Sequence, residues 1–283
     1  MTAQAAGVNG RRKRRLVANT FGVVTLLFSL FPLYWLVATS FKKTEEIRTE
    51  TPVLAPIPPQ FSNYSTAWHT DGFLTSLRNS IVVTAAAVII GMAIAFFAAV
   101  ALGRFWFRGR TLFIVALILI QMIPGEALFV PYLVIAQDLK IQGKMITLVL
   151  VYISFVLPLS IWMLRGFVRA VPKEIEEAAL TDGATRAQAF RKVLFPLIAP
   201  GIVATSIFGF LSCWNEFVYA YTLTNQPSQY TVPVQILSFI SPRGVDWGAV
   251  MAMSVIFTIP AVAFFLFVQR RAVGGLTAGA VKG

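Results

Sequence analysis

The chain alternates long apolar segments with shorter polar ones. Six segments are apolar over about the length of a membrane span: Leu16–Thr39, Ser80–Ala101, Thr111–Ile135, Met145–Met163, Ile198–Thr222 and Trp247–Val268. A helix of roughly 20 residues crosses the ~30 Å hydrocarbon core of a bilayer, and it satisfies its own backbone hydrogen bonds where there is no water. The pattern therefore predicts an all-α, polytopic membrane protein with six transmembrane helices.

Composition narrows the class of protein further. Of the 283 residues, 57% are hydrophobic and only 13% are charged, and the mean hydropathy is +0.73; soluble domains carry about 25% charged residues. The net charge of +12 is spread over the ends of the apolar segments, so we expect membrane lipid, and no nucleic acid, as a partner. Cys213 is the only cysteine, which excludes an internal disulfide and a cysteine-based metal site.

The basic residues predict the orientation. With a cytoplasmic N-terminus, 17 of the 24 Lys and Arg residues lie on the cytoplasmic side and 7 on the other, as the positive-inside rule favours. The first apolar segment is too long for a signal-peptide core and no small-residue cleavage site follows it, so we expect an uncleaved anchor. The predicted organisation is a basic tail (1–15), a transmembrane domain (16–270) and a C-terminal tail (271–283), with both tails cytoplasmic.

Two of the three predicted outer loops are long. The first, from Phe41 to about Leu77, is rich in proline, which favours an extended path along the surface. The third runs from Asn225 to about Asp246. It could hold a partner or only cap the helix ends, and its length leaves both open.

The longest polar interruption on the predicted cytoplasmic side covers residues 165–197. Pro172 suits the first turn of a helix, and the glutamates after it favour the positive N-terminal end of that helix. Small residues, including Ala178 and Ala179, would form a narrow apolar face. Gly183 can take the left-handed conformation that ends a helix. These residues predict a short helix with a small-residue face.

A second helix is predicted in the same loop. Thr185 and Gln188 form a capping-box pair at its start, and the helix would stop at Pro196. Another protein could approach the small side chains of the first helix closely, with the flanking charges setting its position. Alternatively, the loop only packs against its own helix ends.

Two carboxylates fall inside apolar segments, where an ionisable side chain usually faces a water-filled path or a partner. Glu216 follows Trp214 and Asn215, which could stack on a sugar ring and bind its hydroxyls. Pro124-Gly125, before Glu126, would break the third helix and free backbone groups for a cavity. We predict as possible parts of a substrate pathway the residues Trp214, Asn215, Glu216 and Glu126. Alternatively, Glu216 orients its helix by bonding neighbouring backbone, and Glu126 lies near the outer surface.

The polar loop also resembles a known family. Glu177-Ala178-Ala179, then Gly183, then Val193, Phe195 and Pro196 match the EAA motif of ABC importer permeases, with Val and Phe in place of the usual Ile and Leu. The resemblance implies the type I importer permease fold and a coupling helix that inserts into a separate ATP-binding subunit. It marks these coupling positions: Glu177, Ala178, Ala179, Gly183, Arg186 and Pro196.

The likeness runs along nearly the whole chain and is greatest with the carbohydrate-uptake branch. The run Trp214-Asn215-Glu216-Phe217 and the tail from Gln269 to Gly283 resemble the maltose-type permease subunit, whose C-terminal tail reaches the ATPase. By this resemblance, Thr277 and Lys282 belong to the ATPase-contacting tail.

The resemblance implies a membrane subunit of an ATP-driven carbohydrate importer in the cytoplasmic membrane of a bacterium. Its partners would be a second, homologous permease, two ATP-binding subunits and an extracytoplasmic solute-binding protein. The chain contains no G-x-x-x-x-G-K-[ST] sequence, the phosphate-binding loop of ATPases. ATP and Mg²⁺ would therefore be bound by the separate subunits, and we expect no catalytic residue, cofactor or metal in this chain.

Three other functions compete with this one. An ABC permease for another polar solute, such as a glycerophosphodiester, would have the same architecture. A proton- or ion-coupled secondary transporter could use Glu126 and Glu216 as a relay, although the absence of a visible inverted repeat argues against it. A membrane scaffold that does not transport is the third alternative.

Overall fold

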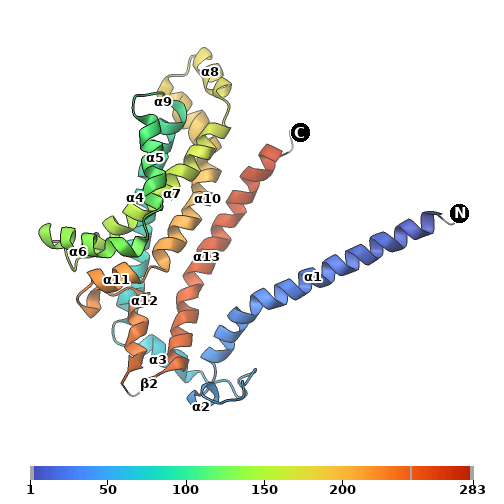
Figure 1. The fold of residues 1–283 in the computed structure, drawn as a ribbon, viewed down its shortest axis with the longest axis vertical. Helices are drawn as coiled ribbons and strands as arrows, with labels where there is room; N and C mark the ends of the chain where they lie inside the picture. Colours follow the sequence, from blue (N-terminus) through green and yellow to red (C-terminus); the bar gives the residue numbers. More distant parts are fainter. Residues whose placement is uncertain (1–2, 243, 281–283) are drawn as a thin grey trace. The chain divides into compact units, whose positions relative to one another are not determined.

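The computed structural model describes residues 3–242 and 244–280, with side chains from 16 to 242 and from 244 to 269. The chain divides into two compact units. The first comprises residues 1–70 and 239–256, and the second comprises residues 71–238 and 257–283. Figure 1 shows their elements coloured along the sequence.

Over its described residues, the first unit contains three helices, a two-stranded hairpin and the beginning of the last helix. Its elements are α1 (Ala3–Ser40), α2 (Thr44–Ile47), α3 (Ser62–His69), β1 (Ile240–Ser241), β2 (Gly244–Val245) and the first part of α13 (Trp247–Ala280). The strands pair antiparallel, with Ile240 opposite Val245.

Side-chain donors hold the polar segments of this unit together. Asn63 Nδ2 donates to the carbonyl oxygens of Ser40 (2.9 Å) and Lys42 (2.8 Å) at the end of α1. Arg48 Nη2 donates to the carbonyl oxygen of Val245 in β2 (3.1 Å). The two Asn63 bonds satisfy backbone acceptors that the end of α1 leaves open, and the Arg48 bond joins the segment after α2 to β2.

Lys42 is buried just beyond the apolar part of α1. Its Nζ lies 3.7 Å from the centre of the Trp35 ring, a cation–π contact. Burial lowers the pKa of the Lys42 amine, and the nearby Glu46 carboxylate opposes that shift. The membrane-length helix is therefore followed by a charged group packed against an aromatic ring.

The second unit contains the remaining elements. They are α4 (Phe73–Arg104), α5 (Arg110–Gln121), η1 (Gly125–Leu128), α6 (Phe129–Asp138), α7 (Met145–Ala170), α8 (Lys173–Thr181), α9 (Arg186–Ala189), the π-helical turn η2 (Phe190–Leu194), α10 (Phe195–Trp214), α11 (Val218–Leu223), η3 (Pro227–Gln229), α12 (Val232–Gln235), η4 (Ile236–Phe239) and the rest of α13.

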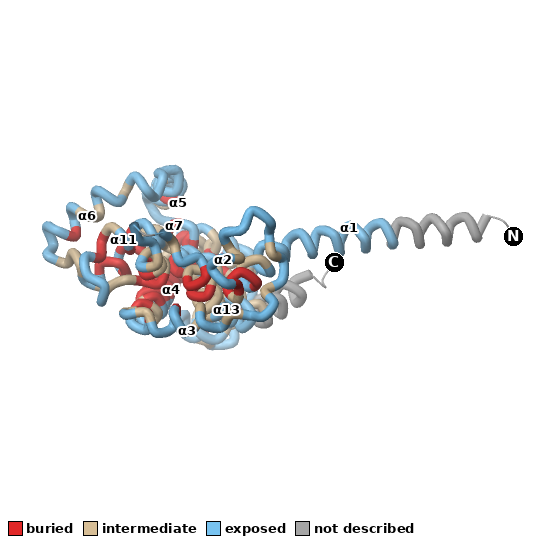
Figure 2. Tube along the Cα trace, turned by 90° about the horizontal axis from the view of Figure 1, so that it is seen from below, coloured by how far each residue is buried: buried red, intermediate tan, exposed pale blue. Residues whose placement is uncertain are grey.

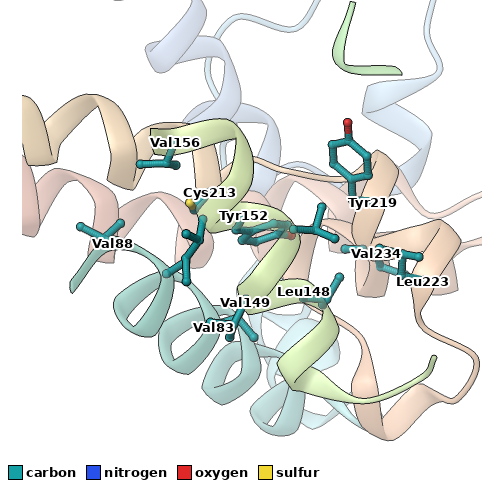
Figure 3. Close-up of a cluster of buried hydrophobic side chains, with 14 of the residues drawn as sticks. Val83, Val88, Leu148, Val149, Tyr152, Val156, Cys213, Tyr219, Leu223 and Val234 are labelled. Atoms are coloured by element: carbon teal, nitrogen blue, oxygen red, sulfur yellow. The ribbon is translucent and has the colours of Figure 1, made fainter. Parts of the chain in front are cut away.

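The core of this unit lies between α4, α7 and α10. Val83 and Val88 of α4 pack with Leu148 and Val156 of α7 in one buried cluster (Figure 3). The trace in Figure 2 is buried along much of α4. The three core helices therefore bury one another, and the remaining apolar surface is left for lipid or other chains.

Two glycines allow these helices to approach closely. A Cβ at Gly103 of α4 would lie 2.5 Å from a methyl group of Val168, and a Cβ at Gly201 of α10 would lie 2.4 Å from the ring of Phe167. Both distances are well below van der Waals contact. Small residues at helix interfaces permit such packing in membranes, where apolar burial gives helices little reason to associate.

Five helices of the described residues are long and apolar enough to cross a membrane, or up to six if one bent pair counts as a span. That pair is the third predicted span: α5 and the η1–α6 segment meet at 98°. The break falls at Pro124, where the sequence predicts one, but the span is not the single helix through Ile135 that the apolar pattern predicts. Proline explains the break, because it lacks the N–H needed to continue the helix.

Candidate functional site

The loop that carries the EAA-like residues contains the two helices predicted from its sequence. Pro172 (φ −59°, ψ 138°) directly precedes α8, and Gly183 has a φ of +87° after α8 ends. The capping box is present: Thr185 N donates to Gln188 Oε1 (2.8 Å), and Gln188 N donates to Thr185 Oγ1 (3.3 Å). Local chemistry alone therefore accounts for where α8 begins and ends and for where α9 begins.

The predicted end of the second helix is wrong. The helical path does not stop at Pro196 but continues from Arg186 to Trp214, through α9, η2 and α10. A π turn, Phe190–Leu194, lies just before Pro196. Proline removes one N–H from the helical hydrogen-bond ladder, and the wider π turn before Pro196 already alters that ladder.

The α8 helix presents its residues outward. It contains no buried residue, and Glu177 and Ala178 are both exposed. Figure 1 shows α8 and α9 together at one end of the elements α4, α7 and α10. Glu177 and Arg186 line a cavity of about 240 Å³ between α8, α9 and the end of α4. The EAA-like residues thus form an accessible surface with a hollow beside it.

The Glu216 carboxylate lies in a break between α10 and α11. Its Oε1 accepts a hydrogen bond from Tyr219 N (2.7 Å), and its Oε2 accepts from Ala220 N (3.0 Å) and from the Tyr152 hydroxyl of α7 (2.8 Å). The carboxylate therefore caps α11 and joins it to α7. This is the backbone-bonding arrangement that the sequence left open as an alternative to a pathway role. The fifth predicted span, written through Thr222, ends as a continuous helix at Trp214.

Trp214 is enclosed by other aromatic rings. It is 2% exposed and stacks on Phe210 (5.3 Å between ring centres) and Phe257 (4.8 Å). Its Nε1 donates to the carbonyl oxygen of Phe257 (3.2 Å). Both ring faces and the indole donor are occupied, so Trp214 packs α10 against α13 within the second unit.

Asn215 and Glu126 are exposed. Asn215 Nδ2 donates to the carbonyl oxygen of Leu211 (3.0 Å). Tyr219, whose backbone bonds Glu216, also donates through its hydroxyl to the carbonyl oxygen of Gly125, next to Glu126. The breaks at Pro124 and at Asn215 are therefore brought together, although the sequence separates them by about ninety residues.

Sequence reasoning missed an exposed aromatic pair. The rings of Phe217 and Tyr221 stack 5.5 Å apart and are 36% and 58% exposed. Their four-residue spacing is a signal for a shared helical face. This signal was not usable from the sequence alone. An apolar run shows neither that α10 ends at Trp214 nor which of the aromatic rings after it face outward.

Two other predictions concern residues that the structure does not describe fully. Lys282 lies outside the described residues, and Thr277 lies in the part of α13 whose side chains are not described. Among the side chains that are described, no group of three or more His, Cys, Asp or Glu residues could hold a metal ion.

Residues 87–275 match the family of binding-protein-dependent transport system inner membrane components. The chain belongs to this family. The EAA-like loop, the α10–α11 break and most of α4 all lie inside the matched region. The prediction of an ABC importer permease, a multi-pass membrane protein, is thereby confirmed.

The relatives of the chain include permeases named for sugars. It is 44% identical over 269 residues to the diacetylchitobiose uptake system permease protein DasC of Streptomyces coelicolor, covering 95% of this chain and 98% of that one. It is 38% identical over 258 residues to the trehalose transport system permease protein SugB of Mycobacterium tuberculosis, covering 90% and 93%. The resemblance to the carbohydrate-uptake branch is therefore confirmed.

A solved structure shares the fold. A chain from a bacterial ABC transporter involved in the import of alginate matches with a TM-score of 0.76 at 22% sequence identity, covering 92% of this chain and 97% of that chain. The predicted type I importer permease fold is confirmed by this likeness, which at such low identity concerns the fold alone.

Proposed function

We propose that the chain is a transmembrane subunit of an ATP-driven importer for a carbohydrate in the cytoplasmic membrane of a bacterium. The observation that carries this proposal is the exposed α8 helix, which presents Glu177-Ala178-Ala179 between membrane-length helices in a chain of this transport family. A short exposed helix with small side chains suits insertion into a groove of another protein.

The proposed assembly has three kinds of protein partner. A second, homologous permease completes the translocation pathway, two ATP-binding subunits receive the loops that carry α8, and an external solute-binding protein delivers the sugar. Both termini and α8 face the cytoplasm, as the distribution of basic residues favours. ATP hydrolysis belongs to the separate subunits, and the C-terminal tail with Thr277 and Lys282 contacts them.

The proposed cargo is a mono-, di- or oligosaccharide. Relatives named for diacetylchitobiose and trehalose make these two sugars the first to test. Within this chain, the exposed Asn215 and Glu126 can offer hydrogen bonds to hydroxyl groups. The exposed pair of Phe217 and Tyr221 can offer an aromatic face to a sugar ring. The ring of Trp214 is enclosed and is not accessible for this contact.

The test is uptake of labelled diacetylchitobiose and trehalose into cells that express the complete importer. We expect Glu177→Lys to abolish uptake and to reduce the ATP-binding subunit that co-purifies with this chain. Glu45→Lys, the same charge change at an exposed position of the first unit, should leave co-purification unchanged. We also expect vanadate to inhibit transport in vesicles. Uptake that a protonophore abolishes while ATP persists would instead indicate an ion-coupled transporter.

A further inference from the structure

The α8 helix has few attachments to the membrane-length helices. None of its residues is buried. Among the residues whose side chains are described, one polar contact joins a side chain of α8 to such a helix: Arg104 Nη2, at the end of α4, lies 2.7 Å from Glu176 Oε1. This ion pair is therefore the polar link between α8 and α4, beside the packing of α8 on α9 and η2 and its short connection to α7.

Burial makes the pair sensitive to the loss of either member. The side chain of Arg104 is 8% exposed and that of Glu176 is 23% exposed. A charge in such a place is poorly hydrated, so removing its partner leaves an uncompensated charge, whereas an exposed pair would exchange its contact for water. The same cavity that Glu177 lines borders both side chains.

The second part of the loop rests on the same helix. Phe190, at the start of η2, packs against Phe96 of α4 (5.6 Å between ring centres) and stacks on Phe97 (6.3 Å). Thus α8 is attached to α4 by charge, and η2 is attached to α4 by aromatic contacts. A displacement of α8 or η2 can act on α4 through these contacts, in addition to the covalent connections to α7 and α10.

At its other end, α4 holds the segment that contains η3 and α12. Asn79 Nδ2 donates to the carbonyl oxygens of Ser228 (2.9 Å) and Tyr230 (3.0 Å), and Val232 N donates to Ser80 Oγ (2.9 Å). The helix between these contacts and Arg104 is uninterrupted and about 36 Å long at 1.5 Å per residue. One rigid element therefore joins the α8 loop to the loop segment at the opposite end of the unit.

We propose that the Arg104–Glu176 ion pair is a strut that passes movements of α8 to α4, and through α4 to the loop segment around α12. Arg104 is then a positioning residue for transport, although it belongs to none of the EAA-like positions. This inference rests on the proposed docking of an ATP-binding subunit at α8. It adds that docking without the strut leaves ATP hydrolysis uncoupled from uptake.

The test compares Arg104→Gln, Glu176→Gln and the exchanged pair Arg104→Glu with Glu176→Arg in the complete importer. Three quantities are measured: the ATP-binding subunit that co-purifies, ATP hydrolysis in liposomes, and uptake of whichever of diacetylchitobiose and trehalose the wild type takes up faster. Each single variant should retain co-purification and hydrolysis, while the ratio of uptake to hydrolysis falls by about tenfold, within the usual range of coupling between sites. The exchanged pair should recover most of that ratio.

Arg108→Gln is the matched control, because it removes one positive charge from an exposed position four residues beyond Arg104. It should keep the wild-type ratio. A wild-type ratio in both single variants, or an exchanged pair that transports no better than either of them, would overturn the strut. If the wild-type chain retains no ATP-binding subunit, the proposed function itself fails, and this outcome is separate from the first two.

Discussion

Glu216 shows how a single side chain can decide between packing and transport. Its three hydrogen bonds go to two backbone N–H groups of α11 and to the Tyr152 hydroxyl. Residue type predicts that a carboxylate at bilayer depth needs partners. It does not predict whether those partners are solute or protein, because the break after Trp214 and the approach of α7 are tertiary features.

Replacing Glu216 by Gln should weaken this junction. The amide offers one acceptor oxygen in place of two, and its NH₂ group would face a backbone N–H or the tyrosine hydroxyl. Leaving a buried donor unpaired costs about 1–3 kcal/mol, and we expect the free energy of unfolding in mixed micelles to fall by that amount. Glu126→Gln, at an exposed position, is the control. Equal stability of the two variants would contradict the capping role.

Substitutions of Trp214 and Tyr221 should have different effects: the first should lower stability and the second should slow transport. Trp214→Ala removes a ring enclosed by two others, so we expect the free energy of unfolding to fall by about 3–5 kcal/mol. Tyr221→Ala changes an exposed ring and should alter stability by no more than about 0.5 kcal/mol, while slowing uptake of the transported sugar. Unchanged uptake in Tyr221→Ala would remove this ring from the proposed pathway.

At the level of helices, close packing and turn conformation both depend on glycine, for different reasons. Gly201 leaves room for the ring of Phe167, and Gly183 supplies a positive φ in open space. Periodicity in the sequence identifies the helices but not which glycine lies at a crossing. The turn after α8 was predictable because its chemistry is local.

Gly201→Ala should destabilise the contact of α10 with α7. The new methyl group would meet the Phe167 ring at 2.4 Å, and overpacking of this kind costs about 1–3 kcal/mol. Gly166→Ala in α7 is the matched control, because no atom lies within 4 Å of its added Cβ and alanine favours a helix by up to about 1 kcal/mol. Thermal unfolding of both variants in the same detergent measures the difference. A loss in Gly166→Ala as large as in Gly201→Ala would argue against the close contact.

Gly183→Val should loosen the turn between α8 and α9 without any clash. No atom lies within 4 Å of the added Cβ, so the cost is the left-handed backbone alone, about 1–2 kcal/mol. We expect less ATP-binding subunit to co-purify with this variant, and a milder effect from Gly183→Asn, because asparagine tolerates that conformation. If valine and asparagine behave alike, backbone conformation does not control docking.

At the scale of the whole molecule, the membrane-length helices of the second unit leave much of their apolar surface uncovered within that unit. Only 28% of the most apolar window of Arg186–Trp214 is buried, and 44% of that of Phe73–Arg104, against 56% in α7. Lipid covers apolar helices, but exposed apolar surface also marks contacts with other proteins. We attribute part of this surface to the second permease.

Co-expression with the second permease should therefore stabilise the chain. A partner that binds only the folded form raises its apparent stability by mass action. We expect the chain expressed alone to be degraded faster in cells and to elute as aggregates from detergent, and the co-expressed chain to elute as one species. Identical lifetimes with and without the partner would indicate that lipid alone covers these helices.

The sequence alone was sufficient to predict the features that depend on residues close together along the chain. They predicted the membrane-length helices, the break at Pro124, the glycine turn and capping box of the α8 loop, and the family. The folded chain was needed wherever distant residues meet. In the folded chain the helix continues through Pro196, and aromatic rings enclose Trp214. The Glu216 carboxylate bonds to α11 and α7, and Arg104 pairs with Glu176 across about seventy residues of sequence. Spacing reports periodicity and local backbone chemistry, whereas the packing of helices decides which face of each one is covered.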